Sequence, residues 1–318
     1  YLQNKIEIDN LSFNYHGIEL FSQSISINIK NKNYIFKGDL DSKEGALSAS
    51  IIKNFIKNEN FKNIVLSSKN NFSFNISKKF KLSDLNFTSK LYLKKADFKL
   101  KNTTIKKYIP DFKSKITFLD QAINIIYEKK KLVEGSGKFQ IGEKRDNVKY
   151  NIEFNKDQSK FNLEFDINEI PLEINLINFA KREDEAASLK ITGEKKNKNL
   201  FLEKVVLKKN NDIIKLDNIE ISKNFQITNL KKIELEYLDT NKRKNDILVV
   251  QNKKDNFLIE GKNFNLSKII DQILFEDKSK TELLDDKKRI FKINFKKNFI
   301  DDSHHILNLR GNFIMKGD

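Results

Sequence analysis

The residues best suited to chemistry stand together near the end of the chain. Asp301-Asp302-Ser303-His304-His305 places carboxylates, a hydroxyl and imidazoles within five positions. Such groups bind metal ions or form catalytic triads. Adjacent side chains of a strand point to opposite faces, so His304 and His305 do not chelate one ion together, and His16 is the only other histidine. We therefore interpret this stretch as a polar turn that leads into a strand, and we expect no metal site.

Two other kinds of motif fail for similar reasons. Gly135-Ser136-Gly137 lacks the longer glycine pattern and the helix of a phosphate-binding loop, so we expect a bend or a β-bulge there. The acidic stretches Glu183-Asp184-Glu185 and Asp285-Asp286 fall in predicted loops, whereas acid–base catalysis needs converging, desolvated carboxylates. The sequence therefore predicts no catalytic residue, no cofactor and no enzyme activity.

The charge pattern argues against a nucleic-acid partner. The formal net charge is +16, but almost all of the positive charge is lysine, spread along the chain and mixed with Asp and Glu. Proteins that read nucleic acid favour arginine, whose planar fork grips phosphates and guanine edges. Abundant Lys, Asn, Ile and Phe, with no Trp, is typical of an AT-rich genome. We expect no nucleic-acid partner, although a surface that prefers anionic membranes stays open as an alternative.

The elements that must position these residues are mainly strands. Apolar residues alternate with polar ones along most of the chain, as expected of strands with one buried face and one wet face. Many of the 26 phenylalanines stand at alternating positions, so we interpret them as the inner face of a sheet and not as stacking platforms for single-stranded nucleic acid. The clearest alternating sets are Ile6 and Ile8; Leu11, Phe13 and Tyr15; Ile25, Ile27 and Ile29; Phe72, Phe74 and Ile76; Phe291, Ile293 and Phe295; and Leu307 and Leu309.

Helical spacing occurs in three places. Residues 47–56 repeat apolar side chains at helical intervals, residues 103–110 predict a short turn that ends at Pro110, and residues 266–274 form an apolar stripe after a Ser or Asn cap. Lys37-Gly38-Asp39 and Gly311-Asn312 are interpreted as turns. The predicted fold class is mainly β: a long antiparallel, strongly twisted or curled sheet with a few short helices. Such a sheet either closes into a sandwich or curls into an open trough.

Three stretches resemble a known family. They are residues 95–139, Leu189-Lys190-Ile191-Thr192-Gly193, and residues 257–266 with the amphipathic stretch that follows. Together they resemble the AsmA-like superfamily of bacterial envelope proteins, which includes the TamB and YhdP groups. The third stretch departs from the family at Asn265, where an acidic residue is common. The resemblance predicts three parts: a β-meander with one short helix over 1–84, an AsmA-like β-groove over 85–275, and the start of a further β repeat over 276–318.

The resemblance implies a function. Family members are anchored in the inner membrane, and a long curved sheet carries phospholipid between membranes across the periplasm. We therefore expect this chain to be the periplasmic part of a longer anchored protein, with phospholipid acyl chains as its partner and membranes reached through other parts of the parent. A structural scaffold with a closed β core, and a basic platform for polyanions, stay open as alternatives. The expected groove-lining residues are Tyr150, Ile152, Phe154, Phe161, Leu163, Phe165, Leu172, Ile174, Leu176, Ile233, Leu235 and Tyr237.

Overall fold

A computed structural model of the chain describes residues 5–30, 33–48, 51, 60–100, 104–155, 157–197, 199–222, 227–253, 255–275 and 288–315. Strands hold 76% of the residues and helices 4%, so the predicted mainly β fold class is confirmed. Contacts divide the chain into unit 1, residues 1–103 and 113–156, and unit 2, residues 104–112 and 157–318. The boundaries predicted at 84/85 and 275/276 follow the resemblance and stay a prediction.

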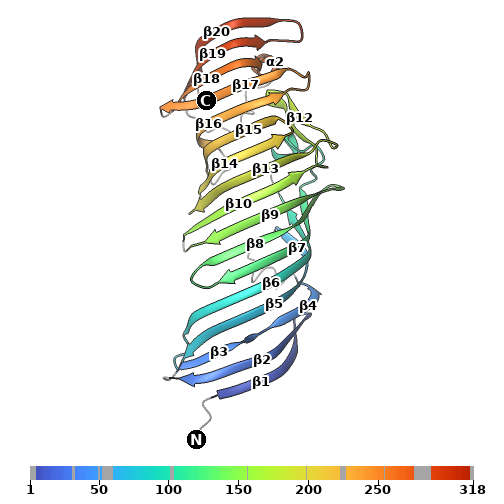
Figure 1. The fold of residues 1–318 in the computed structure, drawn as a ribbon, viewed down its shortest axis with the longest axis vertical. Helices are drawn as coiled ribbons and strands as arrows, with labels where there is room; N and C mark the ends of the chain where they lie inside the picture. Colours follow the sequence, from blue (N-terminus) through green and yellow to red (C-terminus); the bar gives the residue numbers. More distant parts are fainter. Residues whose placement is uncertain are drawn as a thin grey trace. The chain divides into compact units, whose positions relative to one another are not determined.

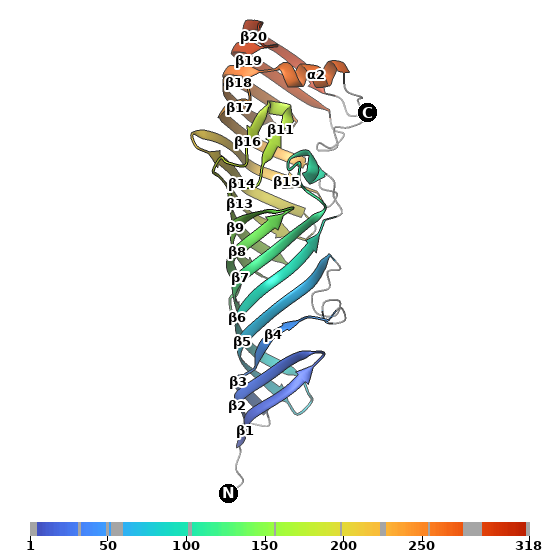
Figure 2. The ribbon, with the colours of Figure 1, turned by 90° about the vertical axis from the view of Figure 1, so that its right-hand side faces the viewer.

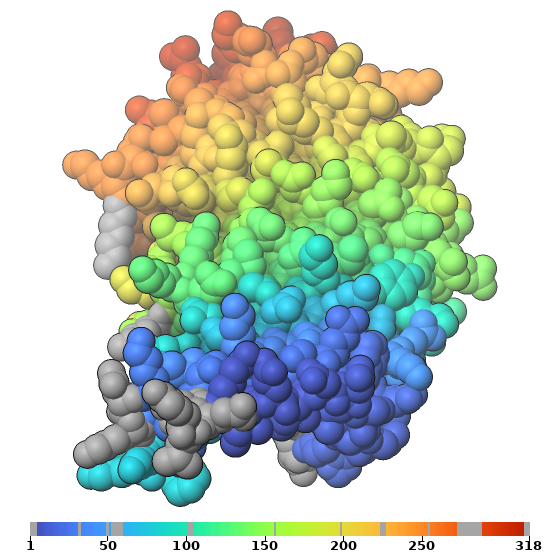
Figure 3. All heavy atoms as spheres, turned by 60° about the horizontal axis from the view of Figure 1, so that its bottom comes forward, coloured from blue at the N-terminus to red at the C-terminus, as the bar shows by residue number. Residues whose placement is uncertain are grey.

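Unit 1 is a single sheet (Figure 1). Its strands pair in chain order and antiparallel, with β3 and β4 sharing the place between β2 and β5. The edge strand β1 lies at the surface in Figure 3, in dark blue. The strands are β1 (Lys5–Tyr15), β2 (Ile18–Lys30), β3 (Asn33–Asp39), β4 (Asp41–Ala46), β5 (Phe61–Ser77), β6 (Leu82–Lys99), β7 (Lys115–Tyr127), β8 (Lys131–Ile141) and β9 (Lys144–Phe154).

The strands of unit 2 also pair side by side in a sheet, with one change of direction. Its strands are antiparallel in chain order except that β18 and β19 run parallel, because a helix returns the chain between them. The expectation of a purely antiparallel sheet was therefore wrong at this pair. The strands are β10 (Gln158–Ile167), β13 (Ala187–Lys196), β14 (Asn199–Lys209), β15 (Asp212–Ile221), β16 (Ile227–Leu238), β17 (Lys244–Lys253), β18 (Asn256–Asn265), β19 (Arg289–Phe299) and β20 (His305–Met315).

Short helices and a hairpin accompany the unit 2 sheet. The returning helix is α2 (Ser267–Phe275), which confirms the amphipathic prediction, and the turn before Pro110 is the 3-10 helix η2 (Thr104–Lys107). Between β10 and β13 the chain forms β11 (Leu172–Ile174), the 3-10 helix η3 (Asn175–Ile177) and β12 (Phe179–Lys181). Figure 2 shows α2 and this hairpin on one side of the sheet. The helix predicted over 47–56 lies almost wholly outside the described residues.

Asparagine and aspartate bend the strands. Six of them adopt positive φ inside a strand, a conformation that these two residues tolerate better than other residues with a Cβ. The pairing register shifts at Asn63, Asp84 and Asp120, which marks a β-bulge, and bulges increase the bend and twist of a strand. At Asn10, Asn218 and Asn308 one residue pair is missing from the ladder, and the register continues unchanged on either side. Part of the asparagine content therefore has a structural use. The six residues are Asn10, Asn63, Asp84, Asp120, Asn218 and Asn308.

Two predicted turns are strand interiors. Gly38 lies in β3 and Gly311 in β20, opposite Ile25 and Ile293. A Cβ atom at Gly38 would lie 2.7 Å from the Ser24 carbonyl oxygen, so the glycine permits close backbone approach. The interruption near Gly38 comes at Leu40, between β3 and β4.

Candidate functional site

One face of the unit 2 sheet is apolar across all its strands. Residues that stand directly opposite each other in neighbouring strands share a face, so the pairing register traces rows across the sheet. The middle row is half-buried from end to end, and no described segment covers it fully. Its members are Leu163, Ile191, Val205, Leu216, Ile233, Val249, Ile259, Ile293 and Gly311.

A second row on the same face is much better covered. Within it Leu207, Ile214, Leu235, Ile247 and Phe295 are buried, with Leu235 at 9% exposure and Phe295 at 3%. This row lies two residues nearer the end of each strand at which the β11–β12 hairpin is attached. The apolar face is therefore closed at one end of its strands and partly open along its middle.

The hairpin closes that end through specific contacts. The Tyr237 hydroxyl donates to the Ile177 carbonyl at 2.6 Å, and the Tyr237 ring packs edge-on against Phe179 at 5.7 Å. Lys209 Nζ, on the same face, donates to the Ala180 carbonyl at 2.9 Å. Burial, with a smaller contribution from Asp239, raises the pKa of Tyr237 far above its ordinary value. These contacts fix the hairpin over the ends of β14 and β16.

Unit 1 carries a comparable row. It runs from β1 to β9, and its members are half-buried or exposed throughout. Tyr127 and Phe154, at the β9 end, are each 39% exposed. The row consists of Ile8, Ile25, Gly38, Phe72, Phe87, Tyr127, Lys131 and Phe154.

Polar side chains interrupt the apolar face of unit 1 near the break at Leu40. Ser42 and Ser68 face each other at 3.0 Å between their hydroxyl oxygens, and Asn70 Nδ2 donates to Ser68 Oγ at 2.8 Å. The Ser22 hydroxyl is buried without a hydrogen-bond partner. This polar patch lies beside the row that runs from β1 to β9, and it interrupts the apolar face of unit 1 only at the Leu40 end of β3 and the neighbouring part of β5.

Aromatic rings lie close over glycines on the apolar faces. A Cβ atom at Gly261 would come within 2.7 Å of the Phe295 ring, and one at Gly193 within 3.0 Å of the Phe161 ring. The Tyr150 ring occupies the same place over Gly135, and burial raises the pKa of Tyr150 to about 12. Each pair stands directly opposite in neighbouring strands. Each ring therefore occupies the space that a side chain would take at the glycine opposite it.

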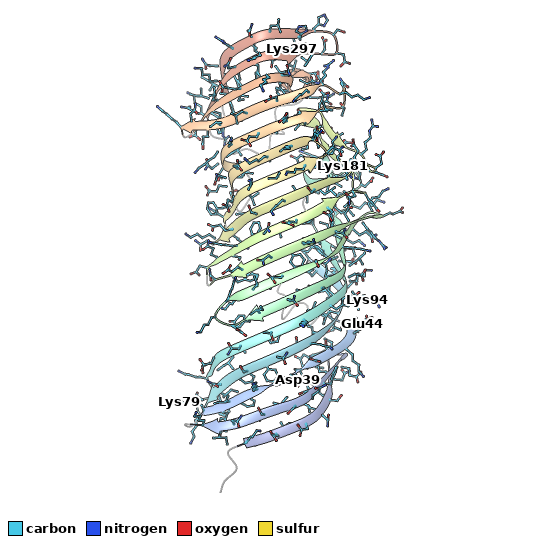
Figure 4. All side chains as sticks on the ribbon, in the orientation of Figure 1. Asp39, Glu44, Lys79, Lys94, Lys181 and Lys297 are labelled. Carbon is cyan, nitrogen blue, oxygen red and sulfur yellow. The ribbon has the colours of Figure 1, made fainter. Side chains whose placement is uncertain are left out.

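The opposite face of each unit carries charged side chains, and lysines there form ion pairs with glutamates of the same face. In unit 2, Lys190 Nζ lies 2.5 Å from Glu164, and Lys215 Nζ lies 2.9 Å from Glu234, across neighbouring strands. In unit 1, Lys94 Nζ lies 2.6 Å from Glu44, and Figure 4 shows the two side chains together. The hydrogen bond from Lys215 lowers the pKa of Glu234. Such pairs help to set the strand register and leave less free positive charge for a polyanion.

The stretches that suggested chemistry do not converge into a site. Asp301–Ser303 form an exposed bend, where His304 Nδ1 lies 2.8 Å from Asp301 Oδ2, and His305 begins β20. Within the described ranges, no three His, Cys, Asp or Glu side chains are grouped to hold a metal ion. Gly135 and Gly137 are regular residues of β8, and the bulge lies opposite them, between Leu119 and Ala122 of β7.

The acidic stretches behave differently from each other. Glu183 and Asp184 are exposed, whereas Glu185 is half-buried and its carboxylate lies 3.5 Å from Lys209 Nζ. Asp285-Asp286 lies outside the described residues. Glu185 therefore helps to hold the hairpin end of unit 2, a role that its sequence context did not indicate.

The predicted groove-lining residues fall into three groups. Those in β9 and β10 and Ile233 lie on the apolar faces and are half-buried, or exposed in the case of Phe154. Leu235 and Tyr237 share the face but are buried under the hairpin end. Leu172, Ile174 and Leu176, read from the sequence as one strand of the main sheet, belong instead to β11 and η3. Val205, Leu216 and Ile293 also line this face but were not among the predicted groove-lining residues, although Ile293 was recognised from the sequence as part of an alternating strand.

No protein family, curated protein or solved structure matches this chain. The resemblance to the AsmA-like superfamily therefore stays a prediction. In the part of the chain that the structure describes, no helix is long and apolar enough to cross a membrane.

Proposed function

We propose that this chain is a non-enzymatic segment of a bacterial envelope protein that binds phospholipid acyl chains along the apolar faces of its sheets and passes them between membranes. The observation that carries the proposal is the half-buried middle row of unit 2, an apolar lane that crosses every strand of its sheet. The AsmA-like resemblance supports a periplasmic location and a membrane anchor in another part of the parent.

The energetics suit reversible binding. Each methylene of an acyl chain that leaves water for an apolar surface contributes about 0.8 kcal/mol. The same methylene is already out of water in a bilayer, so exchange between bilayer and lane is close to balanced. Transfer of this kind needs no bond to form or break, and it uses the lane as an alternative apolar environment.

The two alternatives receive less support. A scaffold with a closed core would cover the apolar face with a second layer. In the described ranges of unit 2 only short segments lie beside the sheet: α2, the β11–β12 hairpin with η3, and residues 104–112 with η2 (Figure 2). A polyanion platform would present unpaired lysines together, whereas Lys190, Lys215 and Lys94 are held by carboxylates.

Site-specific photocrosslinking in cells tests the proposal. A photoreactive residue at Leu216 or Ile233 stands in the half-buried row, and one at Lys160 stands exposed on the opposite face as the control. We expect phospholipid adducts at the two row positions and none at Lys160. Row positions that give no adducts, in a chain that still folds, would contradict lipid binding and favour the scaffold.

A further inference from the structure

An open hollow lies at one end of unit 1, where the β7–β8 hairpin meets the end of β9. Its volume is about 490 Å³, within the range of sites that hold small ligands. Most of its lining residues lie on the apolar face of the sheet by their pairing register. The lining consists of Ile125, Ile126, Tyr127, Lys131, Leu132, Val133, Phe154 and Asn155.

Lys131 is the unusual member of this lining. It stands on the apolar face, directly between Tyr127 of β7 and Phe154 of β9. Its ammonium lies 4.4 Å from the centre of the Tyr127 ring, a cation–π contact. Among the described residues, no carboxylate pairs with Lys131, whereas the adjacent Lys130 lies 3.7 Å from Glu153. Within the part of the chain that the structure describes, Lys131 is therefore a cation in the hollow that no carboxylate pairs with.

The surroundings of Lys131 are those of an amphiphile site. Ile125 and Val133 supply half-buried apolar surface in the hollow, and the more exposed Tyr127 and Phe154 stand on the strands to either side of Lys131. Aromatic rings beside a lysine suit the boundary between an apolar chain and a charged headgroup, because each ring combines an apolar body with affinity for a cation. The Tyr127 ring makes a cation–π contact with the Lys131 ammonium, and an anion beside the ammonium would add a charge-assisted hydrogen bond.

We infer that this hollow is a headgroup station, in which Lys131 binds the phosphate of a phospholipid whose acyl chain lies over Ile125 and Val133. The inference rests on the proposed function, since it assumes that acyl chains occupy the apolar face. It adds a preference: lipids with a net negative headgroup bind here more tightly than zwitterionic ones, whose own ammonium competes with Lys131 for the phosphate.

The experiment compares two variants of equal charge in the whole chain. Lys131→Gln removes the cation in the hollow, and Lys130→Gln removes its neighbour, which is paired outside it. Binding of short-chain phosphatidylglycerol and phosphatidylcholine is measured by calorimetry. We expect Lys131→Gln to weaken phosphatidylglycerol binding roughly tenfold, the scale of one charge-assisted hydrogen bond, with Lys130→Gln close to wild type and Lys131→Arg restoring affinity. Equal affinities for the two glutamine variants would overturn the inference.

Two further readouts separate this inference from the proposed function. A photoreactive residue at Val133 reports acyl contact, and adducts there with no headgroup preference would overturn the station and leave lipid binding intact. Adducts at neither Val133 nor Ile233 would overturn both. Glycerol phosphate is the soluble competitor: competition as strong as that of the whole lipid would mean a simple anion site and would also overturn the inference, whereas weak competition supports it.

Discussion

The contrast between two neighbouring apolar rows gives the sharpest test of the structure. Ile233 and Leu235 lie two residues apart on β16, on the same face and between the same two strands. Ile233 is half-buried, with Leu216 and Val249 beside it, whereas Leu235 is buried at 9% exposure under the hairpin end. Substitution by alanine removes the same number of carbon atoms at both positions. Any difference in the free energy of unfolding therefore reports coverage.

The expected magnitudes differ by a factor of two or more. Truncation of a buried aliphatic side chain to alanine lowers the free energy of unfolding by about 2–5 kcal/mol. Leu235→Ala should therefore lower it by about 3 kcal/mol. Ile233→Ala removes side-chain surface that water already reaches and leaves little cavity, so it should cost about 1–1.5 kcal/mol.

Urea unfolding followed by circular dichroism measures both variants against the unsubstituted chain. The dependence of unfolding free energy on urea should stay unchanged, so that the shift in midpoint reports stability alone. Equal losses at the two positions would mean that the middle row is covered in solution, and they would refute the open lane. The open lane also predicts an effect of lipid, because a ligand that binds the folded state raises its stability. Added phospholipid should stabilise the unsubstituted chain more than the Ile233→Ala variant, which has lost part of the apolar surface that binds the lipid.

Three further outcomes follow from particular contacts. Tyr237→Phe removes the hydrogen bond to the half-buried Ile177 carbonyl and should cost about 1 kcal/mol, with faster proteolysis of the β11–β12 hairpin as the readout. Asn218→Ala places an ordinary side chain at φ 53° and should cost about 1 kcal/mol in urea unfolding, whereas Asn218→Gly should be close to neutral. The pKa of Glu234 is lowered by the hydrogen bond from Lys215, so its stabilising contribution is present above pH 4.5 and is lost as the pH falls below this value; Glu234→Gln should flatten that part of the pH–stability curve measured by urea unfolding.

The sequence predicted the strands well because alternation is a local property. Phe161, Leu163 and Phe165 alternate on one face of β10, as their pattern indicated. The same pattern in Leu172 and Ile174 did not reveal their partner, since a short alternating run pairs equally well with a neighbouring strand or with its own hairpin. Local pattern therefore fixed the type of element but not its place.

The features that the sequence did not predict depend on contacts between residues far apart in the chain. The α2 helix was predicted from its apolar stripe, yet nothing in that stripe states that β19 returns parallel to β18. The missing pair at Asn218 left a readable trace: apolar positions change phase between Leu202 and Val205, and between Leu216 and Ile219, beside Asn218. The exposure of the middle row could not be predicted, because alternation says which side chains share a face and nothing about what covers it.

The pairing of strands in chain order has a consequence for how such a sheet forms and changes. Almost every strand within a unit bonds to the strand that precedes it and the one that follows it in sequence, so most pairings close short loops. Low sequence separation favours rapid, stepwise growth from any hairpin. Such a sheet can gain or lose a hairpin without disturbing distant pairings, as solenoid proteins gain or lose repeats, and its reach can be adjusted by duplication with the rest of the chain unaltered.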